Sequence, residues 1–458
     1  MDPKLNKASF RDPAGFVFTE DGVLRRQISF TYKLHYEKLV SSGLLKKLTD
    51  NGFLISHEEE VAPANVYKLI KPKKIDFISY PYEWCFSQLK DAALLTLEIQ
   101  KFALNCGMTL KDASAYNIQF QNGKPILIDT LSFEIYEEGK PWIAYRQFCE
   151  HFLAPLALMS KTDARLNQLL KVFLDGVPLP LTSRILPFSS YFNLSLLANI
   201  HLHAWFQNKH SSSAPKHDDI RMSKDRILSV VESLKMGIQG LTWAPKGTEW
   251  GEYYSDTNYD SVAMNSKLEA VELMISELKP HSVWDLGANT GEFSELASRK
   301  GIDTVAFDID SAAIEKAYLK ARALGEKSLL PLVLDLTNPS PSIGWANEER
   351  MSLFERGPVD LVLALALVHH LRISNNIPFR MMAEYFSRLT SNLVIEFIPA
   401  EDSKVQILGR TRIIPTDYNQ NAFEAEFCEY FTIEKRVAVK NSLRWIYLMR
   451  KKYEVSAE

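Results

Sequence analysis

A glycine-rich turn, DLGANTG, begins at Asp285 directly after an apolar segment. Gly287, Asn289 and Gly291 alternate within it, and glycines allow a sharp turn and a close approach to a ligand where a strand meets its helix. A dinucleotide fingerprint would read GxGxxG, but position 289 is Asn and position 292 is Glu. An acid beside a helix N-terminus repels a pyrophosphate. The pattern therefore predicts a site for an uncharged or zwitterionic nucleoside.

Two further acids end the next two apolar segments. Asp308 lies in TVAFDID, about 20 residues after the glycine turn, where a carboxylate binds ribose hydroxyls. Asp335 ends PLVLD at the position expected for an adenine amino group, and Leu336 follows it. Acids placed at strand ends by chance are the alternative. Three motifs at three consecutive strand ends favour the nucleoside site.

The elements that position these residues alternate between strands and helices. Strands are predicted near 282–286, 303–307, 331–334, 359–366, 392–398, 430–438 and 443–450. This alternation predicts an α/β fold with a doubly wound parallel sheet and helices on both faces. The last two strands should form a hairpin that turns at Lys440-Asn441 and adds an antiparallel strand. The segment between Asp335 and the fourth strand is predicted to be a loop plus a helix.

DLGANTG, FDID and VLDL resemble successive cofactor motifs of class I S-adenosylmethionine (SAM) methyltransferases, and this resemblance covers about residues 245–450. It implies a Rossmann-like fold and a SAM site made of Asp285, Gly287, Asn289, Gly291, Asp308, Asp335 and Leu336. The glycines would pack against the methionine end of SAM, and Asp285 would orient its amino group. Asp308 would bind the ribose, while Asp335 and Leu336 would frame the adenine.

An aromatic and acidic segment, TEWGEYYSDTNY, precedes the first of these strands. It is interpreted as a lid over the cofactor, with Tyr253 or Tyr254 against the sulfonium in a cation–π contact. An aromatic helix packed on the sheet is the alternative.

Methyl transfer requires mainly alignment of the nucleophile and exclusion of water, and a base only if the acceptor is protonated. His369 and His370, which follow the apolar run LALALV, are the candidates for a base. Alternatively, they only line the crevice. Glu396 ends the strand VIEF, and because an unpaired buried acid is costly, a site role is favoured for it. Glu401 and Asp402 follow, either facing an acceptor or solvated.

The first half has a different character, α+β and mostly helical. A hairpin is predicted over 16–28 with its turn at Asp21-Gly22. Helical spacing follows over 31–55, then one or two short strands over 66–80 and a long amphipathic helix over 84–105. Most of 141–207 is apolar with helical spacing.

Within this half, LKDASAYNIQFQNGKPILID places Asp112, Asn117 and Asp129 at the spacing found in kinase-like phosphotransferases. There, a loop Asp accepts the hydroxyl proton, while the Asn and the later Asp hold metal ions. The order of elements over roughly 15–205 also resembles a shrunken two-lobed kinase. The departures are an acidic hairpin turn without GxGxxG and no VAIK-like lysine, for which Lys68 and Lys74 are the substitutes. A degenerate binding module or a helical domain is favoured over an active kinase-like site.

Residues 208–219, NKHSSSAPKHDD, are polar and without periodicity, which predicts a linker. The predicted organisation is therefore an N-terminal domain over 1–207, a linker over 208–222 and a methyltransferase domain over 223–458.

Composition narrows the class of protein. A hydrophobic content of 46% predicts large cores, and a net charge of −3 argues against nucleic acid as a partner. The four cysteines show no CxxC pairing, so neither disulfides nor a metal site is expected. No signal peptide or membrane span is recognised, which predicts a cytoplasmic protein. The oligomeric state stays open.

FRDPAGFVF near the start and SLRWIYL near the end resemble nodulation-related bacterial methyltransferases. This resemblance implies an enzyme that methylates a small molecule or a protein, with the N-terminal domain assisting acceptor selection. The alternative is a non-catalytic SAM-binding or scaffold protein whose kinase-like module binds a nucleotide.

Overall fold

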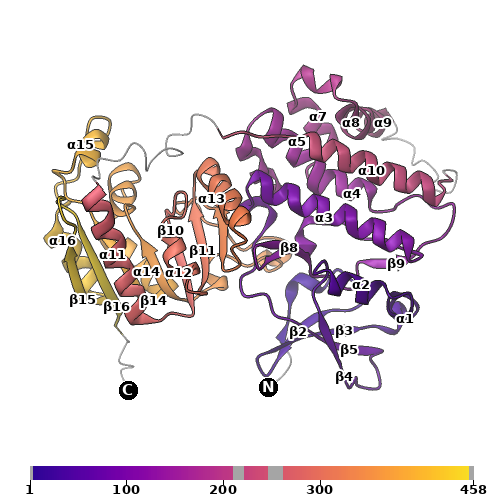
Figure 1. Ribbon diagram of the computed structural model, residues 1–458, viewed down its shortest axis with the longest axis horizontal. Coiled ribbons are helices and arrows are strands. Elements are labelled where there is room, and N and C mark those ends of the chain that lie inside the picture. The colour runs from indigo at the N-terminus through magenta and orange to yellow at the C-terminus, as the bar shows by residue number, and fades with distance from the viewer. Residues whose placement is uncertain (1–3, 210–220, 246–260, 453–458) are drawn as a thin grey trace. The chain divides into compact units, whose positions relative to one another are not determined.

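The computed structural model describes residues 4–209, 221–245 and 261–452, which form two compact units. The first unit is Met1–Ala244 together with Ser342–Arg350, and the second is Pro245–Pro341 together with Met351–Glu458 (Figure 1).

The second unit is built on a seven-stranded sheet with the order β12-β11-β10-β13-β14-β16-β15. Its strands are β10 (Ser282–Leu286), β11 (Asp303–Asp308), β12 (Leu329–Val333), β13 (Val359–Ala364), β14 (Thr390–Phe397), β15 (Phe431–Ala438) and β16 (Trp445–Lys451). The first five are parallel, whereas β16 pairs antiparallel with β14 and with β15. The predicted doubly wound, Rossmann-like sheet with a terminal hairpin is confirmed.

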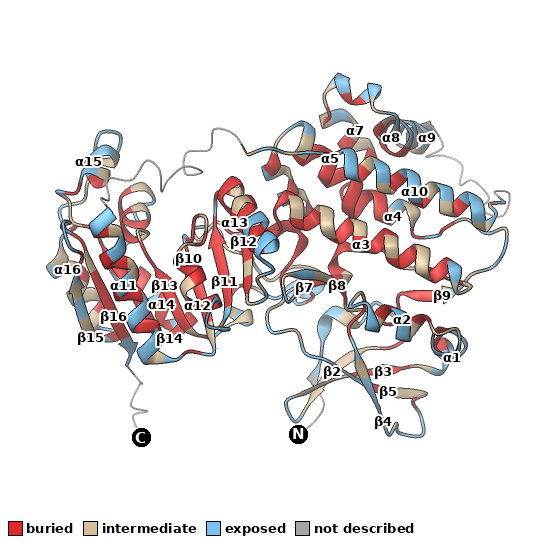
Figure 2. Ribbon diagram, viewed as in Figure 1, coloured by how far each residue is buried: buried red, intermediate tan, exposed pale blue. Residues whose placement is uncertain are grey.

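Helices cover this sheet, and their apolar faces close its core. They are α11 (Ser261–Leu278), α12 (Ser294–Ser298), α13 (Ser311–Leu324), α14 (Phe379–Leu389), α15 (Ser403–Gly409), α16 (Gln420–Cys428) and a π-helix at His370–Ser374. Val271 and Ile275 of α11 pack with Val283 of β10 and Leu361 of β13, all fully buried. Figure 2 shows the central strands as buried along their length.

The strand order reverses between β10 and β13, because β11 and β12 lie on one side of β10 and β13 and β14 on the other. In parallel sheets the crevice beyond the carboxyl ends at this reversal is the usual place for a ligand. The fold therefore puts the glycine turn after β10 at the expected position for a binding site.

The helix predicted between Asp335 and β13 is absent from the described residues there, which contain only short 3₁₀ turns at Trp345–Asn347 and Phe354–Arg356. Two prolines, Pro339 and Pro341, lie at the start of this stretch. Proline lacks the backbone donor that a continuing helix needs.

The first unit begins with a five-stranded antiparallel sheet in the order β1-β2-β3-β5-β4. Its elements are β1 (Lys4–Leu5), β2 (Val17–Glu20), β3 (Val23–Ile28), α1 (Lys33–Ser41), α2 (Leu44–Asp50), β4 (His57–Glu60) and β5 (Lys68–Pro72). The predicted hairpin is confirmed: Asp21 and Gly22 have φ values of 49° and 76° between β2 and β3.

Helices and two small antiparallel sheets follow. They are α3 (Phe86–Asn105), β6 (Met108–Leu110), β7 (Ile118–Gln121), β8 (Lys124–Leu127), β9 (Phe133–Ile135), α4 (Tyr145–Phe148), α5 (Ala154–Lys161), α6 (Leu169–Val172), α7 (Leu179–Ile185), α8 (Leu194–Leu196), α9 (His203–Lys209) and α10 (Lys224–Gly240). One small sheet is made of β6 and β9, and the other is a hairpin of β7 and β8. The long helix predicted over 84–105 is confirmed as α3.

Helix α10 belongs to the first unit, although the sequence placed it with the second. Its buried residues Ile227, Val231, Leu234 and Ile238 recur at helical spacing, and α10 packs against α3. The Lys235 ammonium also lies 3.1 Å from Glu98 of α3. An amphipathic helix must bury its apolar face somewhere, and the sequence pattern does not show which unit supplies the partner.

All four cysteines are free thiols, as predicted. Among the described helices, none combines the length and the apolarity needed to cross a bilayer.

Candidate functional site

The turn after β10 has the backbone conformation that its glycines allow. Gly287 and Gly291 have φ values of 81° and 87°, and Asn289 between them has 51°. The N–H groups of Gly287 and Ala288 donate to the carbonyl of Phe307 on β11, at 2.8 and 2.9 Å. These bonds hold the turn against the end of β11.

Asp308, the last residue of β11, holds the glycine turn from the other side. Its carboxylate accepts hydrogen bonds from the N–H of Asn289 at 2.7 Å and of Asp310 at 2.8 Å. Asp310 in turn caps α13 by accepting from the N–H of Ala312 at 2.8 Å. The second carboxylate oxygen of Asp310 is buried and has no hydrogen-bond partner.

Asp285 is the next-to-last residue of β10, whereas Asp308 is the last residue of β11. Asp285 is 2% exposed, and its carboxylate accepts a hydrogen bond from the Ser294 hydroxyl at 2.6 Å. Burial raises the pKa of both Asp285 and Asp308 to about 6, since desolvation disfavours the ionised form. The site therefore contains two carboxylates that a positively charged or hydroxyl-bearing ligand would stabilise in their ionised form.

Asp335 and Leu336 follow β12 and are half-buried. The Asp335 carboxylate accepts hydrogen bonds from the N–H and hydroxyl of Thr337, at 2.8 and 2.6 Å. Parallel pairing sets Asp285 opposite Ala306 and Asp308 opposite Val333, so the carboxyl ends of β10, β11 and β12 lie side by side. The structure thus brings the three predicted strand ends together, while Tyr253 and Tyr254 lie outside the described residues.

Glu396 is fully buried at the end of β14, and its contacts are internal. One oxygen accepts from the Lys267 ammonium and from the N–H of Ala366, both at 2.7 Å. The Arg444 guanidinium lies 3.8 Å from the other oxygen and also binds Asp402 at 2.7 and 3.1 Å. This geometry favours a positioning role for Glu396, and a direct role in chemistry stays a prediction.

Lys267 and Arg444 are functional candidates that the sequence analysis missed. Lys267 comes from α11, is 2% exposed, and lies 4.7 Å from the centre of the Phe293 ring, just past the glycine turn. The signal in the sequence was a lysine on the apolar face of a helix, with alanine and valine three and four residues later. Its partner Glu396 lies 129 residues away in the sequence, so the local pattern around Lys267 does not predict the pair.

His369 and His370 follow β13, and their rings lie against each other with centres 4.0 Å apart and planes tilted by 40°. Burial lowers the pKa of His370 to about 4 and that of His369 well below its usual value. The nearby His370, Arg444 and Lys267 lower the pKa of His369 further. Both imidazoles are therefore neutral at pH 7, and the buried Nδ1 of His369 has no hydrogen-bond partner. Their use as a base stays a prediction.

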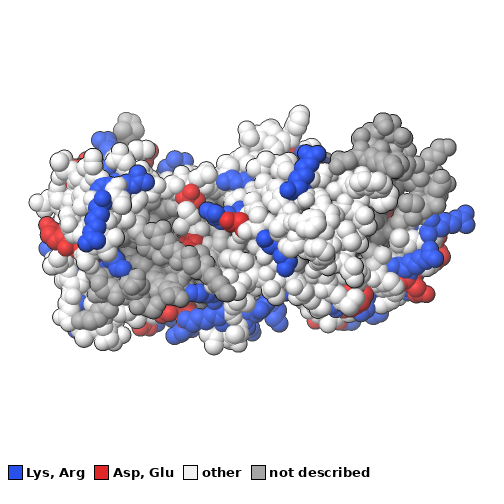
Figure 3. All heavy atoms as spheres, turned by 90° about the horizontal axis from the view of Figure 1, so that it is seen from above, with Lys and Arg blue, Asp and Glu red and all other residues white. Residues whose placement is uncertain are grey.

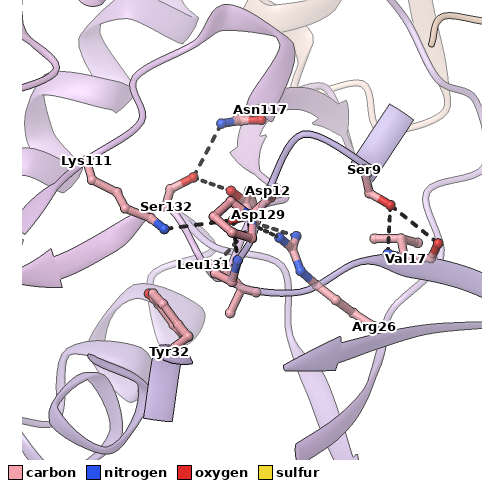
Figure 4. A network of polar contacts seen from close by, with 12 residues as sticks. Ser9, Asp12, Val17, Arg26, Tyr32, Lys111, Asn117, Asp129, Leu131 and Ser132 are labelled. Atoms are coloured by element: carbon pink, nitrogen blue, oxygen red, sulfur yellow. Dashed lines mark hydrogen bonds and ion pairs between the residues drawn. The ribbon is translucent and has the colours of Figure 1, made fainter. Parts of the chain in front are cut away.

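In the first unit, the structure brings Asp112, Asn117 and Asp129 to one place. The Asn117 amide donates to the Ser132 hydroxyl at 3.3 Å, and that hydroxyl donates to Asp129 at 2.5 Å (Figure 4). Asp112 accepts from the side-chain amide of Gln147 at 2.9 Å, and burial followed by the charge of Asp129 raises its pKa.

Arg26, on β3, was not predicted to belong to this cluster. Its guanidinium lies 2.5 Å from Asp129 and 2.8 Å from Asp12, and Figure 4 shows it directed at both carboxylates. Lys111 adds a second positive charge 3.9 Å from Asp12. The substitute lysines considered from the sequence lie elsewhere, since Lys68 pairs with Glu59 and Lys74 is exposed.

On the face of the molecule drawn in Figure 3, Lys and Arg side chains form separate small groups interspersed with Asp and Glu.

Along nearly its whole length, the chain is similar to a known protein. It is 33% identical over 456 residues to the nodulation protein NoeA of Rhizobium meliloti (strain 1021), covering 96% of this chain and 94% of that protein. No family model matches the chain.

Solved structures resemble part of the chain only distantly. The magnesium protoporphyrin IX methyltransferase of Synechocystis PCC 6803 with bound SAH is 16% identical over 44% of this chain and 93% of that one, with a TM-score of 0.32. The N-methyltransferase NodS of Bradyrhizobium japonicum WM9 is 14% identical over 42% and 99%, also with a TM-score of 0.32. The bifunctional kinase-methyltransferase WbdD is 18% identical over 43% and 41%, with a TM-score of 0.30. Likeness at this level adds no argument to the geometry of the site.

The full-length match rests on one-third identity along nearly the whole of both proteins. The chain belongs to the family of the nodulation protein NoeA.

Proposed function

We propose that this protein is a SAM-dependent methyltransferase whose cofactor binds at the carboxyl ends of β10, β11 and β12. The observation that carries the proposal is the pair of buried carboxylates, Asp285 and Asp308, on either side of the turn formed by Gly287 and Gly291. Buried acids at this turn repel a dinucleotide pyrophosphate but stabilise a ligand that carries an ammonium and ribose hydroxyls.

The residues at this site fit SAM. Asp285 would face the amino group, Asp308 the ribose, and Asp335 with Leu336 the adenine. The unpartnered oxygen of Asp310 is a further hydrogen-bond acceptor next to Asp308. SAM supplies a methyl group on a sulfonium, which is an activated leaving group. The chain has to bind it, align the acceptor and exclude water.

The two histidines and Glu396 complete the proposed site. His369 and His370 are neutral at pH 7, so their rings could accept a hydrogen bond from a methyl acceptor, but their lowered pKa values make them weak bases. Glu396 would position the backbone after β13, because it accepts from the N–H of Ala366 in the segment that leads to the histidines. The proposed acceptor is a small molecule or a protein.

We infer that the first unit is kinase-like and assists acceptor selection. The inference is supported by the succession of a long helix α3, strand β6, the loop with Asp112 and Asn117, hairpin β7–β8, and Asp129. This is the order in which a kinase catalytic loop and its metal-binding Asp occur.

Calorimetric titration with SAM tests the cofactor site. We expect micromolar binding that Gly287→Arg abolishes and Asp308→Ala weakens at least tenfold. Asp303→Ala is the matched control, because Asp303 lies at the opposite, exposed end of the same strand β11. Unchanged binding in both site variants would refute the assignment.

Incubation with methyl-labelled SAM and size-fractionated cell extract tests the activity. Label in a small-molecule or protein fraction, lost with Gly287→Arg, supports methyl transfer. Tight SAM binding without any labelled product or S-adenosylhomocysteine would favour the non-catalytic alternative.

A further inference from the structure

The kinase-like loop of the first unit contains two carboxylates that, in a phosphotransferase, would work with metal ions and a nucleotide. Asp112 and Asp129 meet there, together with Asn117, and Asp12 joins them through Arg26 from the segment before β2. In kinases, the Asn and the later Asp coordinate Mg²⁺, and a lysine on the third strand contacts the phosphates. Whether the residues present fit a metal-bound nucleotide depends on what their oxygens already contact.

Their contacts are with the protein itself. One oxygen of Asp129 contacts the Arg26 guanidinium at 2.5 Å and accepts from the N–H of Leu131 at 3.0 Å. The other accepts from the Ser132 hydroxyl at 2.5 Å. The Asn117 amide is turned toward the same hydroxyl. Both carboxylate oxygens of Asp129 are therefore engaged within the protein.

Arg26 brings the positive charge that a metal would otherwise bring. It lies on β3, the third strand of the chain, and only 10% of its side chain is exposed. Its two terminal nitrogens bridge Asp129 and Asp12, with the second distance 2.8 Å. A guanidinium in a fork between two carboxylates forms strong, charge-assisted hydrogen bonds.

Two neighbouring side chains, Lys111 and Tyr32, lie beside these ion pairs. Lys111 lies 3.9 Å from the other oxygen of Asp12 and 4.9 Å from the centre of the Tyr32 ring. The Tyr32 hydroxyl is itself fixed by donating to the carbonyl of Phe133 at 2.6 Å. Within the described residues, no group of three or more His, Cys, Asp or Glu side chains is arranged to hold a metal ion.

We propose that the Arg26 guanidinium replaces the divalent cation of this loop, so that the first unit binds no metal-bound nucleotide. The residues do not fit Mg-ATP: Arg26 neutralises Asp129 and Asp12 and ties β3 to the loop around Asp129. The loop then serves as an internal ion-pair clamp, in which the ion pairs of Arg26 with Asp12 and Asp129 hold β3 against the loop. This inference concerns the first unit alone and does not depend on methyl transfer.

Titration of the full-length protein with ATP and Mn²⁺ gives the first test. We expect no binding heat and a change in melting temperature below about 1 °C, because both oxygens of Asp129 already have partners and Arg26 supplies the facing positive charge. ATP binding that requires Mn²⁺ and disappears in Asp129→Asn would overturn the proposal.

The second test removes the arginine. In Arg26→Gln the charges of Asp12 and Asp129 lose their partner, so Mn²⁺ should raise the melting temperature of this variant by about 3 °C or more. Adding Asp129→Asn should remove the gain. Arg25→Gln is the matched control, since Arg25 lies next in the same strand but binds Glu60 at 2.7 Å.

A folded Arg26→Gln protein that responds to Mn²⁺ no more than Arg25→Gln would also overturn the proposal. If Arg26→Gln does not fold in metal-free buffer, recovery of the folded protein on adding Mn²⁺ supports it. If recovery fails as well, the wild-type titration decides, because metal-dependent ATP binding contradicts the clamp and its absence supports it.

Discussion

The Lys267 ammonium lies 2.7 Å from the Glu396 carboxylate, and both side chains are almost completely removed from solvent. The pair links α11 to the end of β14 and, through the N–H of Ala366, to the segment after β13. Burial lowers the pKa of Lys267, while Glu396 raises it. The charge of this lysine therefore depends on its partner.

Removing one member of this pair should be strongly destabilising. In Lys267→Met the Glu396 carboxylate remains buried with one fewer donor, and breaking a buried pair costs about 3–5 kcal/mol of unfolding free energy. Urea unfolding of the full chain measures the loss. The control is Asp50→Asn, which breaks the exposed Lys46–Asp50 pair of α2 and should change stability by no more than about 0.5 kcal/mol. Equal losses in the two variants would contradict the role given to Lys267.

The glycine turn allows backbone strain to be separated from ligand binding. Gly287→Ala puts a side chain at φ 81°, with its Cβ 3.4 Å from Leu367, and should lower stability by about 1–2 kcal/mol. Gly301→Ala introduces the same kind of strain at φ 74° with no atom within 4 Å of its Cβ. Calorimetry should show SAM affinity reduced at least tenfold in the first variant only. Equal affinities would argue that SAM does not approach this turn.

The elements of the second unit were predictable because four of the five parallel strands end at or within two residues of an acid or a glycine turn. Burial on both faces makes such strands read as short apolar runs, so β10, β11 and β13 are visible in the sequence. The meeting of Asp285 and Asp308 follows from the same rule, since parallel neighbours end at one edge of the sheet.

The remaining features depend on contacts between distant segments. Strand β4 reads HEEE, an acidic edge strand without apolar alternation, and was missed for that reason. Lys267 and Glu396 are 129 residues apart, and Arg26 meets Asp129 only through the fold. Periodicity reports which face of an element is buried but not which partner covers it.

The paired histidines give a spectroscopic prediction. Because burial lowers the pKa of His370 to about 4, NMR titration should show its imidazole neutral throughout pH 6–8. His281 lies on the surface before β10 and serves as the control for an exposed histidine in the same unit. A His370 imidazole that titrates between pH 6 and 8 would mean that the ring is solvated and the site more open than the structure shows.

The buried acids at the strand ends make stability and cofactor binding respond to pH in opposite directions. The pKa of Asp308 is about 6 in the folded protein, above its value in the unfolded chain, so the folded state binds this proton more tightly. Its contribution to stability is present below pH 4 and is lost as the pH rises through about 6. Asp308→Asn loses one of the two backbone hydrogen bonds at every pH, because an amide has one acceptor oxygen. Without ligand, the difference in unfolding free energy between this variant and the wild type should nevertheless shift in favour of the variant by on the order of 2 kcal/mol as the pH rises from 4 to 7.

SAM should favour the ionised Asp308 carboxylate, because its ribose hydroxyls donate to it. Its affinity for the wild type should then fall severalfold from pH 7.5 to 5.5, with proton release detected as a buffer-dependent binding enthalpy. A wild-type affinity that does not change over this range would place the ribose away from Asp308.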